Sequence, residues 1–173
     1  MSWRSSRLLP EVDPVKVVVQ EQSFDPGQEV QRFQDGLPRG KHGGVVTFVG
    51  TMRDFNDGED VVSMRLDHYP GMTEKHIEKV CEEAAERWEI VDSLVVHRHG
   101  DMYPNDAIVL VAVWSAHRAN AFDACRFIIN YLKERAPFWK CETTTEGEKR
   151  WVEHNSRDEK AEVADAAAIK RSA

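Results

Sequence analysis

The chain has 173 residues, of which 41% are hydrophobic and 31% charged, and its net charge is -7. This composition is typical of one globular domain with a core of its own, and the acidity argues against general nucleic-acid binding. No apolar run approaches the roughly 20 residues that a membrane helix needs, and residues 1–14, which we interpret as a flexible arm, lack the apolar stretch of a secretory signal.

The first third of the chain predicts a strand, a short helix and a loop. Residues Val15–Phe24 begin with a β-branched run typical of a strand, and Pro26 can open a short helix that extends through Gln34. Residues 35–44, DGLPRGKHGG, form a loop with four glycines and three basic residues. Because the loop lacks the strand–GxxxxGK[ST]–helix order of a P-loop, we do not predict a phosphate cradle there.

Two strands separated by a polar loop follow. Residues Gly44–Met52 and Val61–Tyr69 have strand patterns, and the Asn-Asp-Gly sequence between them signals a turn. We therefore expect a hairpin with a long tip. Arg53 lies at the base of this tip, either as a cation that positions a ligand or as an ordinary solvated loop residue.

The next segment predicts an amphipathic helix. Thr73 is the expected N-cap, with His76 at the position where a capping box has Glu or Gln. Apolar residues at helical spacing define one buried face: Ile77, Val80, Cys81, Ala84 and Trp88. The opposite face is rich in glutamate and is expected to be solvated.

Two further strands are expected at Ile90–His97 and Asp106–Trp114, and the second is so apolar that both of its faces should be covered. The residues between them read as a turn. His97 and His99 are two residues apart and would share a strand face. Such a pair can bind a metal, but no third ligand stands at a recognisable spacing, so a hydrogen-bonding role is favoured and no metal is predicted.

The stretch Ser115–Glu142 is a cationic island in an acidic protein. Its basic residues are Arg118, Arg126, Lys133, Arg135 and Lys140. Clustered positive charge concentrates an anionic ligand, but a solvated basic helix face would have the same composition. Both interpretations stay open on charge alone.

A helix is expected over Arg118–Arg135, with apolar residues on two sides. The main buried stripe contains Ala121, Phe122, Cys125, Ile128, Ile129 and Leu132. Phe127 and Tyr131 lie on the opposite side, so a second element or a second subunit should cover them. Lys133 lies about 20° from Phe122 on the helical wheel, where a lysine either reaches out to water or is partly dry and able to act as a base or nucleophile.

Pro137 ends that helix, and Phe138–Thr144 reads as a final strand on which Lys140 faces away from its two neighbours. Residues 155–173 read as a charged, alanine-rich tail. The three distant cysteines fit a reducing, cytoplasmic environment better than a disulfide framework or a zinc site. Together these elements predict a single α+β domain over residues 15–154, with a mainly antiparallel sheet and two principal helices.

Five blocks of the sequence resemble one protein family. They are GGVVTFVGTMRD, LDHYPGMTEK, VVHRHGD, SAHRANAFDACRFIINYLKERAPFWKCE and EGEKRWVE. Their content, order and spacing are similar to those of the large, catalytic subunit of molybdopterin synthase, the MoaE family. The resemblance runs from about Val15 to Glu153, with a few extra residues near Leu37 to His42.

This resemblance implies an α/β-hammerhead fold and a sulfurtransferase activity. Such enzymes convert cyclic pyranopterin monophosphate (precursor Z) into molybdopterin, in molybdenum cofactor biosynthesis. The two sulfurs come from the thiocarboxylated C-terminus of a small ubiquitin-like subunit, whose Gly-Gly tail enters a pocket on the large subunit. Two large subunits form a homodimer at the centre of a heterotetramer, and the sulfur transfer needs no metal or dissociable cofactor.

The resemblance also implies roles for five residues. Arg53, His117 and Arg118 match positions that bind the anionic substrate, and Arg118 is suited to bidentate contact with a phosphate. Lys133 and Lys140 match the two catalytic lysines, which stabilise developing negative charge or move protons beside the thiocarboxylate.

The sequence departs from the family's pattern at several places. Met52 and Asp54 flank Arg53, where Val and Asn are more usual, and Cys141 follows Lys140 where a basic residue is common. Beyond Glu153, where some members place an arginine that reaches the neighbouring subunit's site, this chain has His154, Asn155 and Arg157. The sequence therefore does not indicate which of these three residues, if any, completes that side of the substrate pocket.

Two other functions deserve comparison with sulfur transfer. A non-catalytic dimeric module could dock a ubiquitin-like Gly-Gly tail, but it would have no need for both lysines. A protein that binds anions or nucleotides outside this pathway would rest on the basic island alone.

Overall fold

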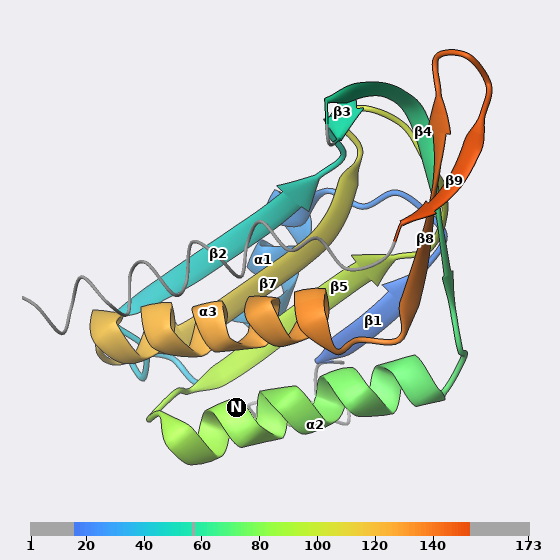
Figure 1. Ribbon diagram of the computed structural model, residues 1–173. Helices are drawn as coiled ribbons and strands as arrows, with labels where there is room; N and C mark the ends of the chain where they lie inside the picture. The colour runs from blue at the N-terminus through green and yellow to red at the C-terminus, as the bar shows by residue number, and fades with distance from the viewer. Residues whose placement is uncertain (1–15, 57, 153–173) are drawn as a thin grey trace, which may run out of the picture.

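The computed structural model describes residues 16–56 and 58–152 (Figure 1). The expected N-terminal arm and C-terminal tail lie outside these residues, as do His154, Asn155 and Arg157. Within the described ranges, no helix has both the length and the apolar character needed to cross a membrane.

A four-stranded sheet forms the centre of the molecule, with the strand order β1-β5-β7-β2. The strands are β1 (Val17–Gln20), β5 (Asp92–Arg98), β7 (Ala107–Ser115) and β2 (Gly44–Thr51). β1 is parallel to β5, and the other two pairs are antiparallel. The β2 register shifts between Gly50 and Thr51, at the end that leads to Arg53.

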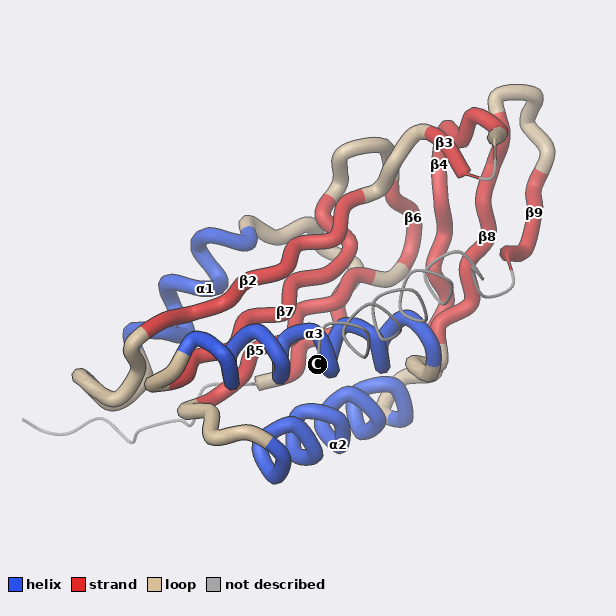
Figure 2. The backbone as a smooth tube through the Cα atoms, turned by 60° about the vertical axis from the view of Figure 1, so that its left-hand side comes forward, coloured by secondary structure: helices blue, strands red, loops and turns tan. Residues whose placement is uncertain are grey.

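Helices cover both faces of this sheet (Figures 1 and 2). They are α1 (Pro26–Asp35), α2 (Met72–Arg87) and α3 (Arg118–Glu134). On β7, Val109, Val111 and Val113 pack in the core under α2 and α3, while the alternate residues Leu110 to Trp114 pack with Phe33 of α1. This confirms that the most apolar strand is central and covered twice.

A second sheet, of five strands, stands at the end of the first. Its strands are β3 (Phe55–Asn56), β4 (Glu59–His68), β6 (Gly100–Met102), β8 (Phe138–Thr144) and β9 (Lys149–Val152). The path is β3-β4-β8-β9, and β6 pairs with β4. A separate core lies on its inner side, around Met64, Leu66 and Met102. The predicted α+β class with mainly antiparallel pairing is thus confirmed, with α1 as a third and shorter helix.

The predicted hairpin of residues 44–52 with 61–69 is wrong. β2 pairs with β7 in the central sheet, whereas β4 pairs with β3, β6 and β8 in the second sheet. Two segments with alternating apolar and polar residues on either side of a turn signal are typical of a hairpin. Here, however, the turn connects the short β3 to β4, and Phe55 of β3 pairs with Asp60 of β4. β6 was read as a turn because a three-residue strand carries little periodicity.

The expected N-cap of α2 is also wrong. Gly71 is the N-cap, with φ +79°, and its N–H donates to the Glu74 carboxylate at 2.7 Å. Thr73 is instead fully buried in the first turn, where its hydroxyl accepts the Tyr69 N–H at 3.2 Å. Glycine takes this cap because a positive φ is costly for other residues. The predicted buried face, from Ile77 to Ala84, is confirmed.

The second apolar side of α3 is covered by α2 of the same chain. The Phe127 ring lies 5.4 Å from the Trp88 ring, and the Arg87 guanidinium lies 4.4 Å from the Phe127 centroid. The predicted burial of Phe122 is wrong, because this side chain is 60% exposed. A second subunit is therefore not needed to cover the Phe127 side.

Candidate functional site

A cavity of about 760 Å³ lies where the two sheets meet. It is lined by the end of β2, the last turns of α3 and the inner face of β8. Three cationic residues predicted from the sequence lie around it: Arg53, Lys133 and Lys140. Much of the remaining wall is apolar, for example Phe48, Ile129, Leu132 and Phe138. The structure thus brings three separate segments of the chain to one concave, cationic place.

Lys133 projects from the last turn of α3. Its neighbour Leu132 is buried and holds the helix end in the core, while Lys133 is exposed and lines the cavity. The wheel placed Lys133 next to Phe122, and both side chains are exposed, so this edge of the helix is wetter than the sequence suggested. Of the two alternatives left open for Lys133, the solvated one is confirmed.

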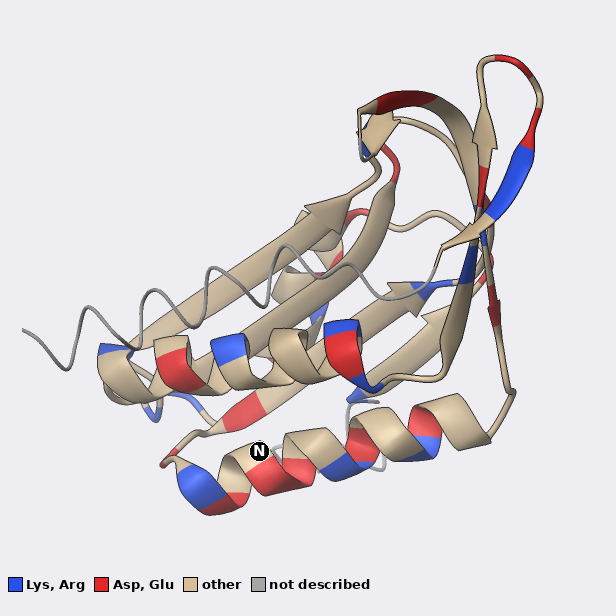
Figure 3. Ribbon diagram, viewed as in Figure 1, with Lys and Arg blue, Asp and Glu red and all other residues tan. Residues whose placement is uncertain are grey.

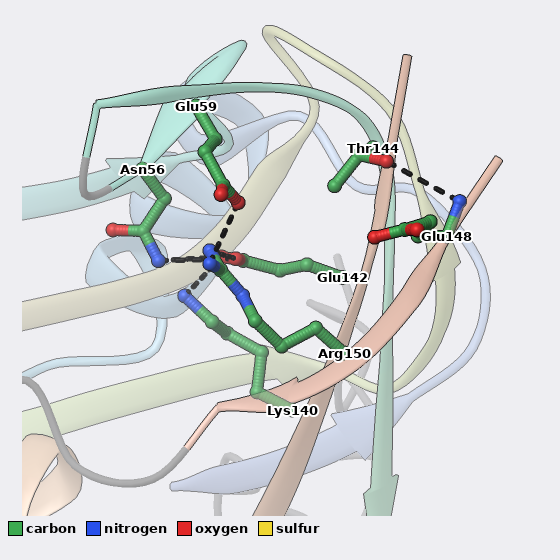
Figure 4. Close-up of polar contacts among 7 residues, drawn as sticks. All are labelled: Asn56, Glu59, Lys140, Glu142, Thr144, Glu148 and Arg150. Atoms are coloured by element: carbon green, nitrogen blue, oxygen red, sulfur yellow. Dashed lines mark hydrogen bonds and ion pairs between the residues drawn. The ribbon is translucent and has the colours of Figure 1, made fainter. Parts of the chain in front are cut away.

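Lys140 is held by a buried carboxylate. Its ammonium lies 2.7 Å from Glu142 Oε1, and the side chains are 30% and 4% exposed, respectively. The two residues are two apart on β8 and therefore share the inner face of the strand. Figure 4 shows Lys140 and Asn56 meeting the same carboxylate from different strands. Lys140 is therefore a partly buried cation with a fixed position at the cavity wall.

Glu142 is the centre of a wider polar cluster. Asn56 donates to both carboxylate oxygens, at 2.9 and 3.0 Å, and Arg150 donates to Oε2 at 3.1 Å. Arg150 also pairs with Glu59 at 2.7 Å, so the cluster links β3 and β4 to β8 and β9. Burial alone would raise the pKa of Glu142, but the hydrogen bonds from Lys140, Asn56 and Arg150 outweigh it and hold the pKa below its usual value.

Arg53 lies two residues after the end of β2 and is exposed at the cavity. Its guanidinium lies 4.9 Å from the centroid of the Phe55 ring. The preceding residue is fixed by the backbone, because Met52 N–H donates to the Asp106 carbonyl and Asn105 N–H donates to the Met52 carbonyl, both at 2.9 Å. The backbone that presents Arg53 is thus pinned, while its side chain can reach a ligand.

His97 and His99 do not act as a pair on one strand face. His97 is buried at the cavity wall, stacked on Phe138 at 3.9 Å, and its Nδ1 lies 2.8 Å from the Arg98 carbonyl. Burial lowers the pKa of His97 to about 4. His99 lies beyond the end of β5, where the centroid of its ring is 4.3 Å from that of the His68 ring. Within residues 16–56 and 58–152, no three His, Cys, Asp or Glu side chains gather in a way that could hold a metal.

His117 and Arg118 stand at the opposite end of α3 from Lys133. His117 is the N-cap and Arg118 the first helical residue. Fifteen residues of α-helix separate Arg118 from Lys133, which corresponds to about 22 Å. Neither residue lines the cavity. Within one chain, the structure therefore does not bring the expected phosphate-binding pair to the two lysines.

None of the three cysteines is among the residues that line the cavity. Cys81, Cys125 and Cys141 are all buried and free. Burial raises the pKa of Cys81 and of Cys125 to about 11. These two thiols are therefore protonated near neutral pH and poor nucleophiles.

Glu142 and Asn56 were not among the residues predicted from the sequence. Glu142 could have been found, because the order Lys140-Cys141-Glu142 on a strand puts the two charges on one face. Asn56 could not, since its contact with Glu142 spans 86 positions.

Comparison with known proteins supplies the family. The model of the MoaE protein family matches residues 19–135, about two thirds of the chain. The chain belongs to the MoaE family. Arg53, His117, Arg118 and Lys133 fall inside the matched range, and Lys140 lies just beyond it.

Curated relatives of this MoaE protein are similar over most of their length. A protein of Ralstonia nicotianae is 51% identical over 143 residues, covering 83% of this chain and 80% of its own. One of Escherichia coli is 47% identical over 146 residues, covering 84% and 95%. Both are named molybdopterin synthase catalytic subunit.

Solved structures of the family show the same fold. A MoaE protein of Burkholderia ambifaria superposes with a TM-score of 0.69 at 43% identity, covering 91% of this chain and 98% of its own. Molybdopterin synthase from Staphylococcus aureus superposes with a TM-score of 0.72 at 27% identity, covering 81% and 98%. A two-subunit molybdopterin-converting factor complex from Helicobacter pylori also matches, with a TM-score of 0.68 over 82% of this chain and 92% of its own, at 18% identity.

Proposed function

We propose that this chain is the catalytic subunit of a molybdopterin synthase. It would convert cyclic pyranopterin monophosphate into molybdopterin by transferring two sulfurs from the thiocarboxylated C-terminus of a small ubiquitin-like subunit. The observation that carries the proposal is the cavity in which Arg53, Lys133 and Lys140 meet. The names of relatives about 50% identical support it. We also keep the cytoplasmic location as a prediction.

The chemistry of the cavity suits two anionic reactants. A thiocarboxylate and a pterin phosphate both carry negative charge, and Arg53 and Lys133 are exposed cations that line the same cavity. Lys133 would stabilise negative charge that develops as sulfur attacks, or pass a proton at its ammonium. Lys140, fixed by Glu142, would assist from the β8 wall. As the family resemblance implies, the transfer would need no metal or dissociable cofactor.

The apolar part of the cavity suits the partner's tail. Phe48 of β2 faces the same space as Ile129 and Leu132 of α3. A Gly-Gly segment has no side chains and can pass between apolar walls where larger residues would clash. The tail of a small ubiquitin-like subunit would enter along these walls and place its thiocarboxylate by Lys133.

His117 and Arg118 can act at this site only from a second copy of the chain. They lie about 22 Å along α3 from Lys133, too far for one pterin to bridge. The proposed homodimer would bring the partner's pair to the cavity. It is supported by β2, an edge strand of the central sheet that leaves Val45 and Val49 partly exposed, with Phe122 exposed on α3.

The experiment that tests the function replaces Lys133 by alanine. We expect the variant to fold with an unchanged melting temperature, because the side chain is exposed, and to lose molybdopterin formation by at least about 100-fold. The assay combines the chain with a thiocarboxylated small subunit and cyclic pyranopterin monophosphate and measures dithiolene formation. Arg126→Ala is the matched control, since Arg126 is an exposed cation of the same helix.

Full activity of the Lys133 variant would rule out this mechanism. A wild-type chain that binds the small subunit but forms no dithiolene would favour the non-catalytic docking module instead. Binding of unrelated nucleotides with comparable affinity would favour the general anion-binding protein.

A further inference from the structure

The loop between α1 and β2 lies against the start of α3. Gly43 N–H donates to the Ser115 carbonyl at 3.0 Å, and a Cβ added at Gly43 would stand 2.5 Å from the Ala116 carbonyl oxygen. The two backbones therefore touch immediately before His117 and Arg118. Figures 1 and 2 show the same proximity from two directions.

The loop is also anchored at its other end. Leu37 is buried in the core beneath α1, and its N–H donates to the Gln34 carbonyl at 3.0 Å. Between the two anchors, Gly40 has a φ of +74°, which reverses the chain between Arg39 and Lys41. Both basic residues are exposed on this fixed turn.

Arg39, Lys41 and Arg118 lie in this region, and in the described residues none of them forms an ion pair with an acidic side chain. The loop from Pro38 to Gly43 contains no acidic residue, and the first turn of α3 contains none either. The backbone carbonyl of Glu89 accepts a hydrogen bond from the Ser115 hydroxyl at 2.7 Å, so this acidic residue contacts the segment through its backbone. In the described part of the chain, its side chain forms no ion pair with Arg39, Lys41 or Arg118. Figure 3 shows basic positions of the loop beside the basic start of α3.

Such an arrangement suits a phosphate group. Lys41 is two residues from Gly43, and Arg118 is two residues from Ala116, so each backbone stands within about 7 Å of the contact. Like charges that are not neutralised repel one another, and a bound anion removes that cost. The N-terminus of α3 adds its own positive end, with backbone N–H groups that no side chain caps.

We propose that Arg39 and Lys41 of the α1–β2 loop extend the cationic surface at His117 and Arg118 and contribute to binding a phosphate ester there. The loop does so with side chains on a pinned turn, not with the backbone cradle of a P-loop. The identity of the ester as the pyranopterin substrate rests on the proposed function, whereas binding of phosphate as such does not.

The test uses the full chain with Arg39 and Lys41 both changed to glutamine. Its control carries Lys75→Gln and Lys79→Gln, which change the net charge equally at exposed positions of α2. Affinity for inorganic phosphate is measured by the rise in melting temperature on titration with phosphate against chloride at equal ionic strength. We expect phosphate to bind about fivefold more weakly to the loop variant, and the control to match the wild type.

A second measurement separates this inference from the proposed function. In the sulfur-transfer assay, the loop variant should raise KM for cyclic pyranopterin monophosphate by about fivefold and leave kcat unchanged, because the loop lies away from the lysines. Equal phosphate affinity in the loop variant and the control overturns the inference, as does a wild-type chain with no phosphate response. Weaker phosphate binding in the loop variant, with no dithiolene formed by any chain, supports the inference and contradicts the proposed function.

Discussion

At the scale of single residues, the buried carboxylate of Glu142 connects the polar side chains at one wall of the cavity. An isolated carboxylate in such a place would be strongly disfavoured, yet three donors from three strands hold it ionised. Two of the donors, Lys140 and Arg150, are themselves partly exposed. Removing the negative charge would therefore release two cations toward water instead of stranding them in an apolar core.

We accordingly predict that Glu142→Gln lowers the free energy of unfolding by about 1–2 kcal/mol at neutral pH. The folded-state pKa of Glu142 is depressed, so its stabilising effect is fully present above the unfolded value of 4.5 and is lost as pH falls through the folded pKa. Urea unfolding of both proteins should show the difference at pH 7 and a shrinking difference below pH 4.5. Glu59→Gln, at the exposed end of the cluster, is the control and should change stability by less than about 0.5 kcal/mol. A difference that does not vary with pH would contradict the assigned role.

At the scale of elements, the turn that leads into β2 contains two neighbouring glycines, Gly43 and Gly44, whose surroundings differ. A Cβ at Gly43 would meet the Ala116 carbonyl at 2.5 Å, whereas a Cβ at Gly44 would meet nothing within 4 Å. We predict that Gly43→Ala lowers the free energy of unfolding by about 1–3 kcal/mol, because the backbone at Ala116, between β7 and α3, cannot yield easily. Gly44→Ala should be neutral or slightly stabilising. Thermal unfolding of the two variants measures the contrast, and equal melting temperatures would refute the close packing.

At the same scale, local sequence patterns predicted which faces of the elements are buried, but not which strands pair with one another. The nearly continuous apolar run within Asp106–Trp114 predicted a doubly covered strand, and the helical spacing of Ile77 to Ala84 predicted a buried face. Periodicity reports which face of an element is buried, but not which strand lies beside it, so β4 was assigned to the wrong neighbour. The roles of Lys133 and Lys140 were implied by the family resemblance, and the order Lys140-Cys141-Glu142 puts both charges on one strand face, whereas the Asn56 donor to Glu142 lies 86 positions away and could not be predicted.

At the scale of the whole molecule, the five predicted site residues lie in two separate places of one chain. The cavity holds Arg53, Lys133 and Lys140, and the pair His117–Arg118 lies about 22 Å along α3. If both groups serve one substrate molecule, each site combines the lysines of one copy with the arginine of the other. Two inactive variants, Lys133→Ala and Arg118→Ala, should then complement each other when mixed.

The expected recovery follows from the symmetry of a dimer. After unfolding and refolding of an equal mixture, half of the dimers are mixed, and each mixed dimer has one site with both residues intact and one with neither. Dithiolene formation should therefore recover to about a quarter of the wild-type rate. Refolding each variant alone is the control and should restore nothing. If both residues act within one chain, the mixture stays as inactive as its components, and the dimeric site would have to be abandoned.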